Sequence, residues 1–342
     1  MANSASGQGP YYLGVDLGGT NIKAGVVDEN AQSLSNVSVP TEADRGPDVG
    51  VENIARASEL ALNESGLAWS DIRGVGLGSP GTMDIPAGLL IDPPNLPGWV
   101  NFPIRERVAE RIGIQTILQN DANAAAYGEY WAGAARNVSS LVLWTLGTGI
   151  GCGIILNEVI LEGAQSHGGE CGHIVIEMTN GRQCDTGQYG TLEAYAGAKN
   201  VILRCQEALD TGRPSTVRER VAAGAELTPL LIAECASAGD ELSEEIVMET
   251  ARYMGVGTTT LIHTVNPEMV LIGGGMTFGG NATPLGRRFL QEIRQEVITR
   301  SFPIPAERTI IEFASLGSHA GYIGAAGCAR LKFGHQARKQ LS

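Results

Sequence analysis

Short apolar runs alternate along the chain with longer segments of helical periodicity. Strands are predicted for residues 11–15, 22–27, 72–77, 114–118, 141–145, 153–156, 269–272 and 309–314. Helices are predicted for residues 49–64, 105–112, 122–131 and 243–265. The first two helical patterns end at Gly66 and Gly113, where glycine favours a left-handed cap. This alternation of strands and helices predicts an α/β fold with mixed sheets.

The length of the chain predicts two domains. It has 342 residues, and a domain typically takes about 100–200. No linker of disordered composition separates the halves, so we place the boundary near residue 120. The prediction is a small α/β domain at 1–120, joined by a C-terminal helix at about 321–342, and a larger α/β domain at 121–320.

Composition and charge narrow the class of protein. The chain is 43% hydrophobic and 18% charged, as in globular proteins with a real core. Its net charge of −13 argues against a nucleic-acid partner, which needs a basic face. The first ten residues lack an apolar signal core, and four glycines interrupt the longest uncharged stretch, 139–157. We therefore expect a cytoplasmic protein without a membrane partner, whose six scattered cysteines are reduced.

A glycine-rich turn follows the first predicted strand. The segment 16–23 is not a Walker A loop, because the required lysine spacing is absent. Gly18 and Gly19 nevertheless let backbone N–H groups approach an anion, while Thr20 adds a hydroxyl and Lys23 a positive charge. Taken alone, the segment also fits an ordinary β-hairpin turn.

Two further segments share this character. Residues 146–151 read Leu-Gly-Thr-Gly-Ile-Gly between two apolar runs, and residues 272–275 read Ile-Gly-Gly-Gly after another. The first repeats the strand–turn–strand pattern of 11–27, which suggests two domains built on related hairpins. The second lies where open α/β sheets bind ligands.

Polar residues with catalytic potential occur in three places. Asn120 and Asp121 precede a predicted helix, where they fit either an N-terminal cap or a carboxylate that accepts a hydroxyl proton. Glu170 and His173 lie in a glycine-rich loop that suits a small polar ligand. Glu193 would, by itself, be an ordinary residue of a first helical turn.

Together these segments resemble the ROK family of sugar kinases and sugar-responsive repressors, especially its bacterial glucokinases. The resemblance extends over residues 12–330 and rests on seven motifs in the right order. They are Asp-Leu-Gly-Gly-Thr-Asn at 16–21, Gly-Ser-Pro-Gly at 78–81, Asn-Asp-Ala-Asn-Ala-Ala at 120–125, Leu-Gly-Thr-Gly-Ile-Gly at 146–151, Gly-Glu-Cys-Gly-His at 169–173, Leu-Glu at 192–193, and Asn-Pro at 266–267 with Ile-Gly-Gly-Gly at 272–275.

The resemblance implies an actin/hexokinase-type (ribonuclease H-like) fold with an active-site cleft between two domains. It implies ATP-dependent phosphorylation of a hexose at the 6-hydroxyl, most simply glucose, with Asp121 as the catalytic base. Sugar-binding residues would be Gly81, Asn120, Asp121, Glu170, His173 and Glu193. ATP and Mg²⁺ would be held by Asp16, Gly18, Gly19, Thr20, Asn21, Lys23, Thr148, Gly149, Gly274 and Gly275, with Asp16 near the metal.

The chain departs from the family pattern at a zinc site. Family kinases commonly bind zinc through the histidine equivalent to His173 and three cysteines of a Cys-x-Cys-Gly-x-x-Gly-Cys segment. Here that segment keeps Cys184, but Thr186 and Thr191 stand at two of the cysteine positions. Hydroxyls are poor zinc ligands, so we expect no structural zinc.

Several alternatives remain open. Other possible sugar substrates are N-acetylmannosamine, N-acetylglucosamine, fructose and allose. Polyphosphate is an alternative phosphoryl donor, although binding such a polyanion would need a basic groove. A sugar-binding regulator is the non-enzymatic alternative. Family repressors carry a helix-turn-helix domain ahead of this fold, which we do not expect because the first strand begins at Tyr11. Family members are usually dimers or tetramers, so a homodimer or homotetramer is expected.

Overall fold

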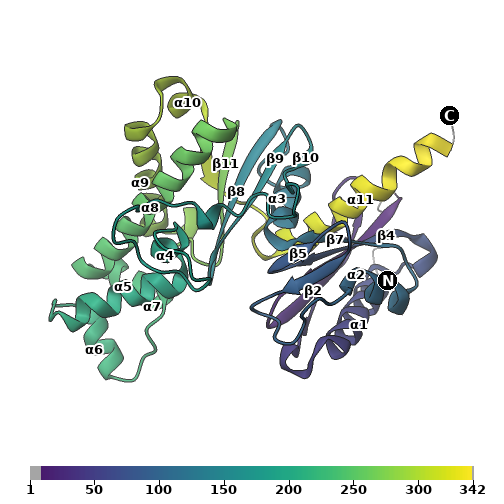
Figure 1. The fold of residues 1–342 in the computed structure, drawn as a ribbon, viewed down its shortest axis with the longest axis horizontal. Helices are drawn as coiled ribbons and strands as arrows, with labels where there is room; N and C mark the ends of the chain where they lie inside the picture. Colours follow the sequence, from purple (N-terminus) through teal and green to yellow (C-terminus); the bar gives the residue numbers. More distant parts are fainter. Residues whose placement is uncertain (1–8, 341–342) are drawn as a thin grey trace, which may run out of the picture. The chain divides into compact units, whose positions relative to one another are not determined.

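The chain folds into two compact units in a computed structural model that describes residues 9–340, with side chains as far as Gly334 (Figure 1). Unit 1 contains the described residues up to Val138, residues 153–169, and those from Ser315 onward; unit 2 contains residues 139–152 and 170–314. Strands and helices alternate in both, which confirms the predicted α/β class. The domain boundary near residue 120 stays a prediction.

Unit 1 is built on a five-stranded sheet of order β3-β2-β1-β4-β7. β1 pairs antiparallel with β2 and parallel with β4, and β4 pairs parallel with β7. A small hairpin of β5 and β6 lies outside this sheet. The strands are β1 (Tyr11–Leu17), β2 (Asn21–Asp28), β3 (Val37–Pro40), β4 (Ile72–Ser79), β5 (Thr82–Asp84), β6 (Leu89–Asp92) and β7 (Thr116–Asn120). Its helices are α1 (Pro47–Ser65), α2 (Ile104–Ile112), α3 (Asp121–Trp131) and α11 (Ala320–Gln340).

The alternation of side chains in β1 places a core on each face of this sheet. Leu13, Val15 and Leu17 point to one face, where they belong to a buried cluster with residues of α1 and α2. Tyr12 points to the other face and packs with Tyr322 of α11 in a second cluster. Successive residues of a strand face opposite sides, so the apolar run fills both cores.

Glycines bring α11 unusually close to its neighbours. A Cβ atom added at Gly14 of β1 or Gly76 of β4 would overlap backbone carbonyls of α11, and one at Gly324 would overlap a carbonyl of α3. Contact between α3 and α11 is therefore backbone against backbone. The C-terminal helix, predicted from sequence to return to the first domain, lies on the sheet of unit 1.

A second five-stranded sheet has the order β10-β9-β8-β11-β12. β11 pairs parallel with both β8 and β12. The strands are β8 (Ser140–Leu146), β9 (Ile150–Leu156), β10 (Val159–Ile160), β11 (Met269–Gly274) and β12 (Ile310–Phe313). The helices of unit 2 are α4 (Glu193–Ala196), α5 (Ala198–Asp210), α6 (Thr216–Ala222), α7 (Pro229–Ser237), α8 (Glu241–Val265), α9 (Pro284–Arg300) and α10 (Pro303–Arg308).

Two further observations bear on the class of protein. All six cysteines lie in the described part of the chain, and each is buried and unpaired. None of the helices described between residues 9 and 340 has the length and apolar content needed to cross a membrane.

Candidate functional site

Asp121 is the first residue of α3, directly after β7. The side-chain oxygen of Asn120 accepts hydrogen bonds from the backbone N–H groups of Ala122 (3.0 Å) and Asn123 (3.1 Å), which makes Asn120 the N-terminal cap. Asp121 Oδ1 accepts from Ala122 N at 2.8 Å. The positive end of a helix favours a negative charge, so this position suits an ionised carboxylate. The cap and the candidate base are thus neighbouring residues with separate tasks.

The parallel strands of unit 1 bring several candidate residues to one edge of the sheet. Asp16 of β1 is in register with Gly78 of β4, and Ser79 is in register with Asn120 of β7. A Cβ atom added at Gly78 would touch both the carbonyl of Val15 and the Cα of Asp121. The loop with Gly81, whose φ is +86°, begins at the end of β4. Carboxyl ends of parallel strands are where such sheets bind ligands.

The turn between β1 and β2 is fixed by one hydrogen bond within it and by another from Thr41. Gly18 N donates to Asn21 O at 3.0 Å, and Thr41 Oγ1 donates to Gly18 O at 2.6 Å. Burial raises the pKa of Asp16, against the opposing effect of Lys23, its partner across the hairpin. A buried carboxylate of this kind is the oxygen donor that Mg²⁺ prefers. The turn therefore fits a metal–phosphate group.

In unit 2 the turn between β8 and β9 lies against Glu193 of α4. Ile150 N donates to Glu193 Oε2 at 2.9 Å, and a Cβ atom at Gly149 would overlap that carboxylate. Glycine at 149 is thus required by a close approach. The sequence did not indicate that Glu193 also braces the turn at Thr148 and Gly149.

The glycines after β11 form the wall of a pocket within unit 2. Gly274 has a φ of +88°, and a Cβ atom there would overlap the backbone of Leu146, its register partner on β8. Beside it opens a cavity of about 440 Å³. Its lining comes from α7 and the segment after β11: Pro229, Leu230, Ala233, Glu234, Ser237, Gly275, Met276, Phe278, Gly279 and Thr283. Sequence patterns pointed to Gly275 but gave no indication of α7.

A group of possible metal ligands corrects one expectation. His173, Cys184 and Glu193 each direct one ligand atom into a common region, and these atoms lie within 4.8 Å of one another. His173 Nδ1 is buried without a hydrogen-bond partner. Zinc accepts nitrogen, thiolate and carboxylate ligands, and three of them leave a fourth position for water. The residues fit zinc, which argues against the predicted absence of zinc; that prediction counted cysteines and overlooked the carboxylate that folds in from α4.

Thr186 and Thr191, which stand at two cysteine positions of the family pattern, form hydrogen bonds with Cys184. Burial raises the pKa of the Cys184 thiol, but hydrogen bonds from Thr186 and Thr191 outweigh it and leave the pKa lowered. Cys184 Sγ lies 3.0 Å from Thr186 Oγ1 and 3.3 Å from Gln188 Oε1. The threonine hydroxyls can donate to the sulfur and favour the thiolate, the form that binds metals, whereas the amide oxygen of Gln188 accepts from the thiol.

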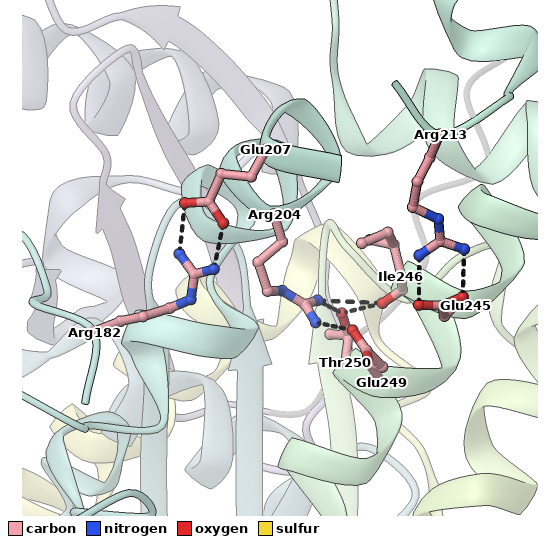
Figure 2. A network of polar contacts seen from close by, with 8 residues as sticks. All are labelled: Arg182, Arg204, Glu207, Arg213, Glu245, Ile246, Glu249 and Thr250. Atoms are coloured by element: carbon pink, nitrogen blue, oxygen red, sulfur yellow. Dashed lines mark hydrogen bonds and ion pairs between the residues drawn. The ribbon is translucent and has the colours of Figure 1, made fainter. Parts of the chain in front are cut away.

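Arg204, a buried arginine of α5, joins α5 to α8 near the group formed by His173, Cys184 and Glu193. Figure 2 shows Arg204 of α5 pointing toward α8, where it donates to Glu249 (3.1 Å), to the carbonyl of Ile246 (3.2 Å) and to Thr250 Oγ1 (2.5 Å). Burial lowers the pKa of Arg204, and the charge of Glu249 opposes this effect. The same guanidinium lies 5.3 Å from the centre of the Tyr253 ring. Its removal would leave the partly exposed carboxylate of Glu249 and the face of the Tyr253 ring without a cation.

Tyr253 of α8 packs against α4, the helix that carries Glu193. Its ring centre lies 4.8 Å from that of Tyr195, which is on α4. Tyr195 Oη in turn accepts a hydrogen bond from Arg182 N at 3.0 Å, and Arg182 pairs with Glu207 (Figure 2). The loop before α4 and the helix itself are thereby held together.

The candidate residues divide between the two units. Unit 1 holds Asp16, Gly18, Gly19, Thr20, Asn21, Lys23, Gly81, Asn120 and Asp121, and unit 2 holds Thr148, Gly149, Glu170, His173, Glu193, Gly274 and Gly275. The unit 1 set lies about the ends of parallel strands and the turns that follow them, whereas Glu170, His173 and Glu193 of unit 2 come from the segment between β10 and α5. Their roles in binding and catalysis stay predictions.

Comparison with known proteins identifies relatives over nearly the whole length. The profile of the ROK family matches residues 12–331. A glucokinase of Halalkalibacterium halodurans is 32% identical over 314 residues, which cover 92% of this chain and 93% of that protein. A xylose repressor of Caldicellulosiruptor bescii is also 32% identical, over 256 residues, covering 74% of this chain and 61% of the repressor. Because both relatives are 32% identical, sequence identity alone does not decide between a sugar kinase and a sugar-responsive repressor.

Comparison with solved structures identifies a ROK family protein with the same fold. A ROK family glucokinase from Streptomyces griseus, in complex with glucose and AMPPNP, superimposes with a TM-score of 0.78 at 31% identity. The match covers 94% of this chain and 99% of that one. It confirms the actin-type α/β fold that the sequence motifs implied.

Proposed function

Because this chain belongs to the ROK family, we propose that it is an ATP-dependent sugar kinase that phosphorylates D-glucose at the 6-hydroxyl. The observation that carries the proposal is the pocket between α7 and the glycines after β11, because it is large and apolar enough to hold a purine base. A repressor that only senses sugar has no need of such a pocket beside a phosphate-suited turn.

Asp121 is the general base of the proposed reaction. Its carboxylate accepts the proton of the 6-hydroxyl while the hydroxyl oxygen attacks the γ-phosphorus. One P–O bond forms and the bond to the β,γ-bridging oxygen breaks, so ADP leaves in line. Such a transfer needs mainly positioning and neutralisation of charge. The position at the start of α3, with Asn120 satisfying the helix end, supports this role.

The remaining sugar hydroxyls go to groups that both donate and accept. Asn120 and His173 offer donors, Glu170 and Glu193 offer acceptors, and the loop at Gly81 encloses the sugar. A site that hydrogen-bonds a hydroxyl rejects an analogue without it by about 10⁴-fold, because its buried partners are left unpaired. This set supports a hexose with free hydroxyls. Glucose is further supported by the segments Gly-Thr-Leu-Glu-Ala-Tyr-Ala at 190–196 and Gly-Tyr-Ile-Gly-Ala-Ala at 321–326, which resemble those of glucokinases more than those of the family's fructokinases or amino-sugar kinases.

ATP and Mg²⁺ go to the glycine-rich turns. Asp16 would hold the metal, which would neutralise phosphate charge, and Lys23 would add a positive charge beside it. Backbone N–H groups at Gly18, Gly19, Thr148 and Gly149 approach the phosphates, with Thr20 and Asn21 completing the first turn. Gly274 and Gly275 adjoin the adenosine. A cytoplasmic location and a homodimer or homotetramer accompany this proposal as predictions.

Two other activities deserve a test beside this one. The match to a xylose repressor keeps a sugar-binding regulator as the second candidate. Polyphosphate as donor is disfavoured, since only 24 of the residues are Lys or Arg against 37 Asp or Glu.

The substrate prediction is that glucose with ATP and Mg²⁺ has the highest kcat/KM. The measurement is a coupled ADP-release assay with glucose, N-acetylmannosamine, N-acetylglucosamine, mannose, fructose and allose; for polyphosphate as donor, glucose 6-phosphate is assayed directly. A tenfold preference for another sugar would overturn glucose but leave the kinase. Binding of a sugar without turnover of any would favour the regulator.

A metal prediction accompanies the function. If His173, Cys184 and Glu193 hold zinc, the ion fixes the orientation of the His173 ring. The protein is expected to retain one zinc per chain after loading and gentle dialysis, and Cys184→Ala to retain little, because one of three protein ligands is gone. Elemental analysis measures both, with Cys235→Ala as control, since Cys235 is buried outside the group. Equal zinc in Cys184→Ala and the control would exclude this ligand set.

A further inference from the structure

Glu129 is a buried carboxylate whose partners are neutral. It lies on α3 with none of its surface exposed. Its Oε1 accepts hydrogen bonds from Ser315 N (2.9 Å) and Leu316 N (2.6 Å), and its Oε2 accepts from Ser315 Oγ (3.0 Å) and Ala134 N (2.9 Å). Burying a charge is costly unless hydrogen bonds compensate it. Four donors aimed at one carboxylate therefore make a strong and specific attachment.

One end of this attachment is the helix of the candidate base. Asp121 begins α3, and Glu129 lies eight residues later, which is about 12 Å along the helix axis at 1.5 Å per residue. Gly128 and Gly324 allow the backbones of α3 and α11 to touch, and the two helices lie side by side in Figure 1. A shift of α3 at Glu129 would therefore move Asp121 with it.

The other end is the segment that leads into α11. Ser315 and Leu316 are followed by a short turn in which Ser318 O accepts a hydrogen bond from Lys23 Nζ at 3.3 Å. Gly321, in the first turn of α11, lies so close to Asp16 that a Cβ atom there would overlap its carboxylate. The same segment thus touches both residues proposed to serve Mg²⁺ and phosphate.

We propose that Glu129 is a positioning residue for phosphoryl transfer, which fixes Asp121 relative to the Asp16–Lys23 turn through residues 315–321. The proposal rests on the proposed kinase function. Glu129 touches neither sugar nor nucleotide in this scheme. It holds the base and the metal-binding turn at a constant separation, on which the geometry of transfer depends.

Asp240 of unit 2 provides a matched control. It is also a buried carboxylate, and it accepts from Ser243 N (2.8 Å), Ser215 Oγ (2.9 Å) and Thr216 N (2.6 Å). These partners join α6 and α8 and include none of the proposed catalytic residues. Asp240→Asn therefore reports what the loss of such an attachment does to stability alone.

The experiment compares Glu129→Gln with Asp240→Asn and wild type. In each variant an amide NH₂ group replaces an acceptor oxygen and faces N–H donors, so both are expected to lower the melting temperature. Only Glu129→Gln is expected to lower kcat, by about tenfold, and to raise the Mg²⁺ concentration for half-maximal rate several-fold. The KM for sugar should change less than kcat.

Two further variants act on the same connection without removing the carboxylate. Ser315→Ala deletes one of the four donors, and Gly321→Ala pushes the Asp16 carboxylate aside. Both should raise the Mg²⁺ requirement, and they decide the matter if Glu129→Gln does not fold. An inactive wild type would refute the kinase function and this proposal with it. An active wild type, with kcat and Mg²⁺ requirement of the unit 1 variants no different from Asp240→Asn, would refute the proposal alone.

Discussion

Replacing Asp121 by alanine is expected to lower kcat by about 10²–10⁴-fold, the usual loss when a general base is removed. The physical reason is that no other carboxylate follows the cap at the start of α3 to accept the proton of the attacking hydroxyl. Weak binding of sugar should persist, because Asn120, Glu170, His173 and Glu193 remain. Initial rates at saturating ATP, with sugar binding followed by calorimetry, measure the two quantities separately.

Asp121→Asn separates the base from the helix end. An asparagine keeps the side-chain oxygen that accepts from Ala122 N at 2.8 Å, so the melting temperature should stay near that of wild type. It lacks the basicity of a carboxylate, so the turnover should fall as it does for alanine. If Asp121→Asn retained most of the wild-type turnover, Asp121 would be a structural residue only.

Replacing Gly274 by alanine is expected to raise the KM for ATP by about fivefold to a hundredfold, because the strain at such a position is about 1–3 kcal/mol and each 1.4 kcal/mol is a tenfold change. Gly274 has a φ of +88°, and an added Cβ atom would overlap the backbone of Leu146. The segment that lines the pocket must then move away from β8. The KM for sugar should change little, since no proposed sugar contact adjoins Gly274.

Gly224→Ala is the control for backbone strain. Gly224 has a φ of +98°, but a Cβ atom there meets no atom within 4 Å; it follows α6 and is not one of the residues that line the pocket. Both variants should lose stability, whereas only Gly274→Ala should lose affinity for ATP. ATP titration of the two purified variants gives the comparison. Equal KM values would mean that Gly274, the last residue of β11, serves the fold and not the nucleotide.

The parts of the fold that sequence predicted are those with strong local signals. Apolar runs marked β1, β4 and β11, and the glycines at 66 and 113 ended their helices as left-handed caps. The helices from α4 to α7 were not predicted individually: α4, α6 and α7 are short, and α4, α5 and α7 are buried through packing against α8. Motif order identified the family, which no single glycine-rich turn does.

The site could be predicted only as far as residues near in sequence reveal it. The role of Asn120 as a cap was apparent from its place before an apolar helix. The approach of Glu193 to His173 and Cys184 depends on how α4 folds back, so a reading based on cysteine spacing missed it. Glu129 likewise gave no signal, since a glutamate within a helix is ordinarily exposed, and three of its four donors belong to Ser315 and Leu316, nearly two hundred residues away.

The placement of α11 on the sheet of unit 1 has a consequence during synthesis on the ribosome. Tyr322, Ile323, Ala326, Ala329 and Phe333 fill the second face of a sheet whose strands all precede residue 121. Domains generally fold as units while the chain emerges from its N-terminus. Here the first sheet to be translated must wait, with the face around Tyr12 and Val27 uncovered, until residue 333 has left the exit tunnel. All of unit 2, residues 139–152 and 170–314, has emerged before that moment, so the half of the protein that begins last is the first able to finish folding.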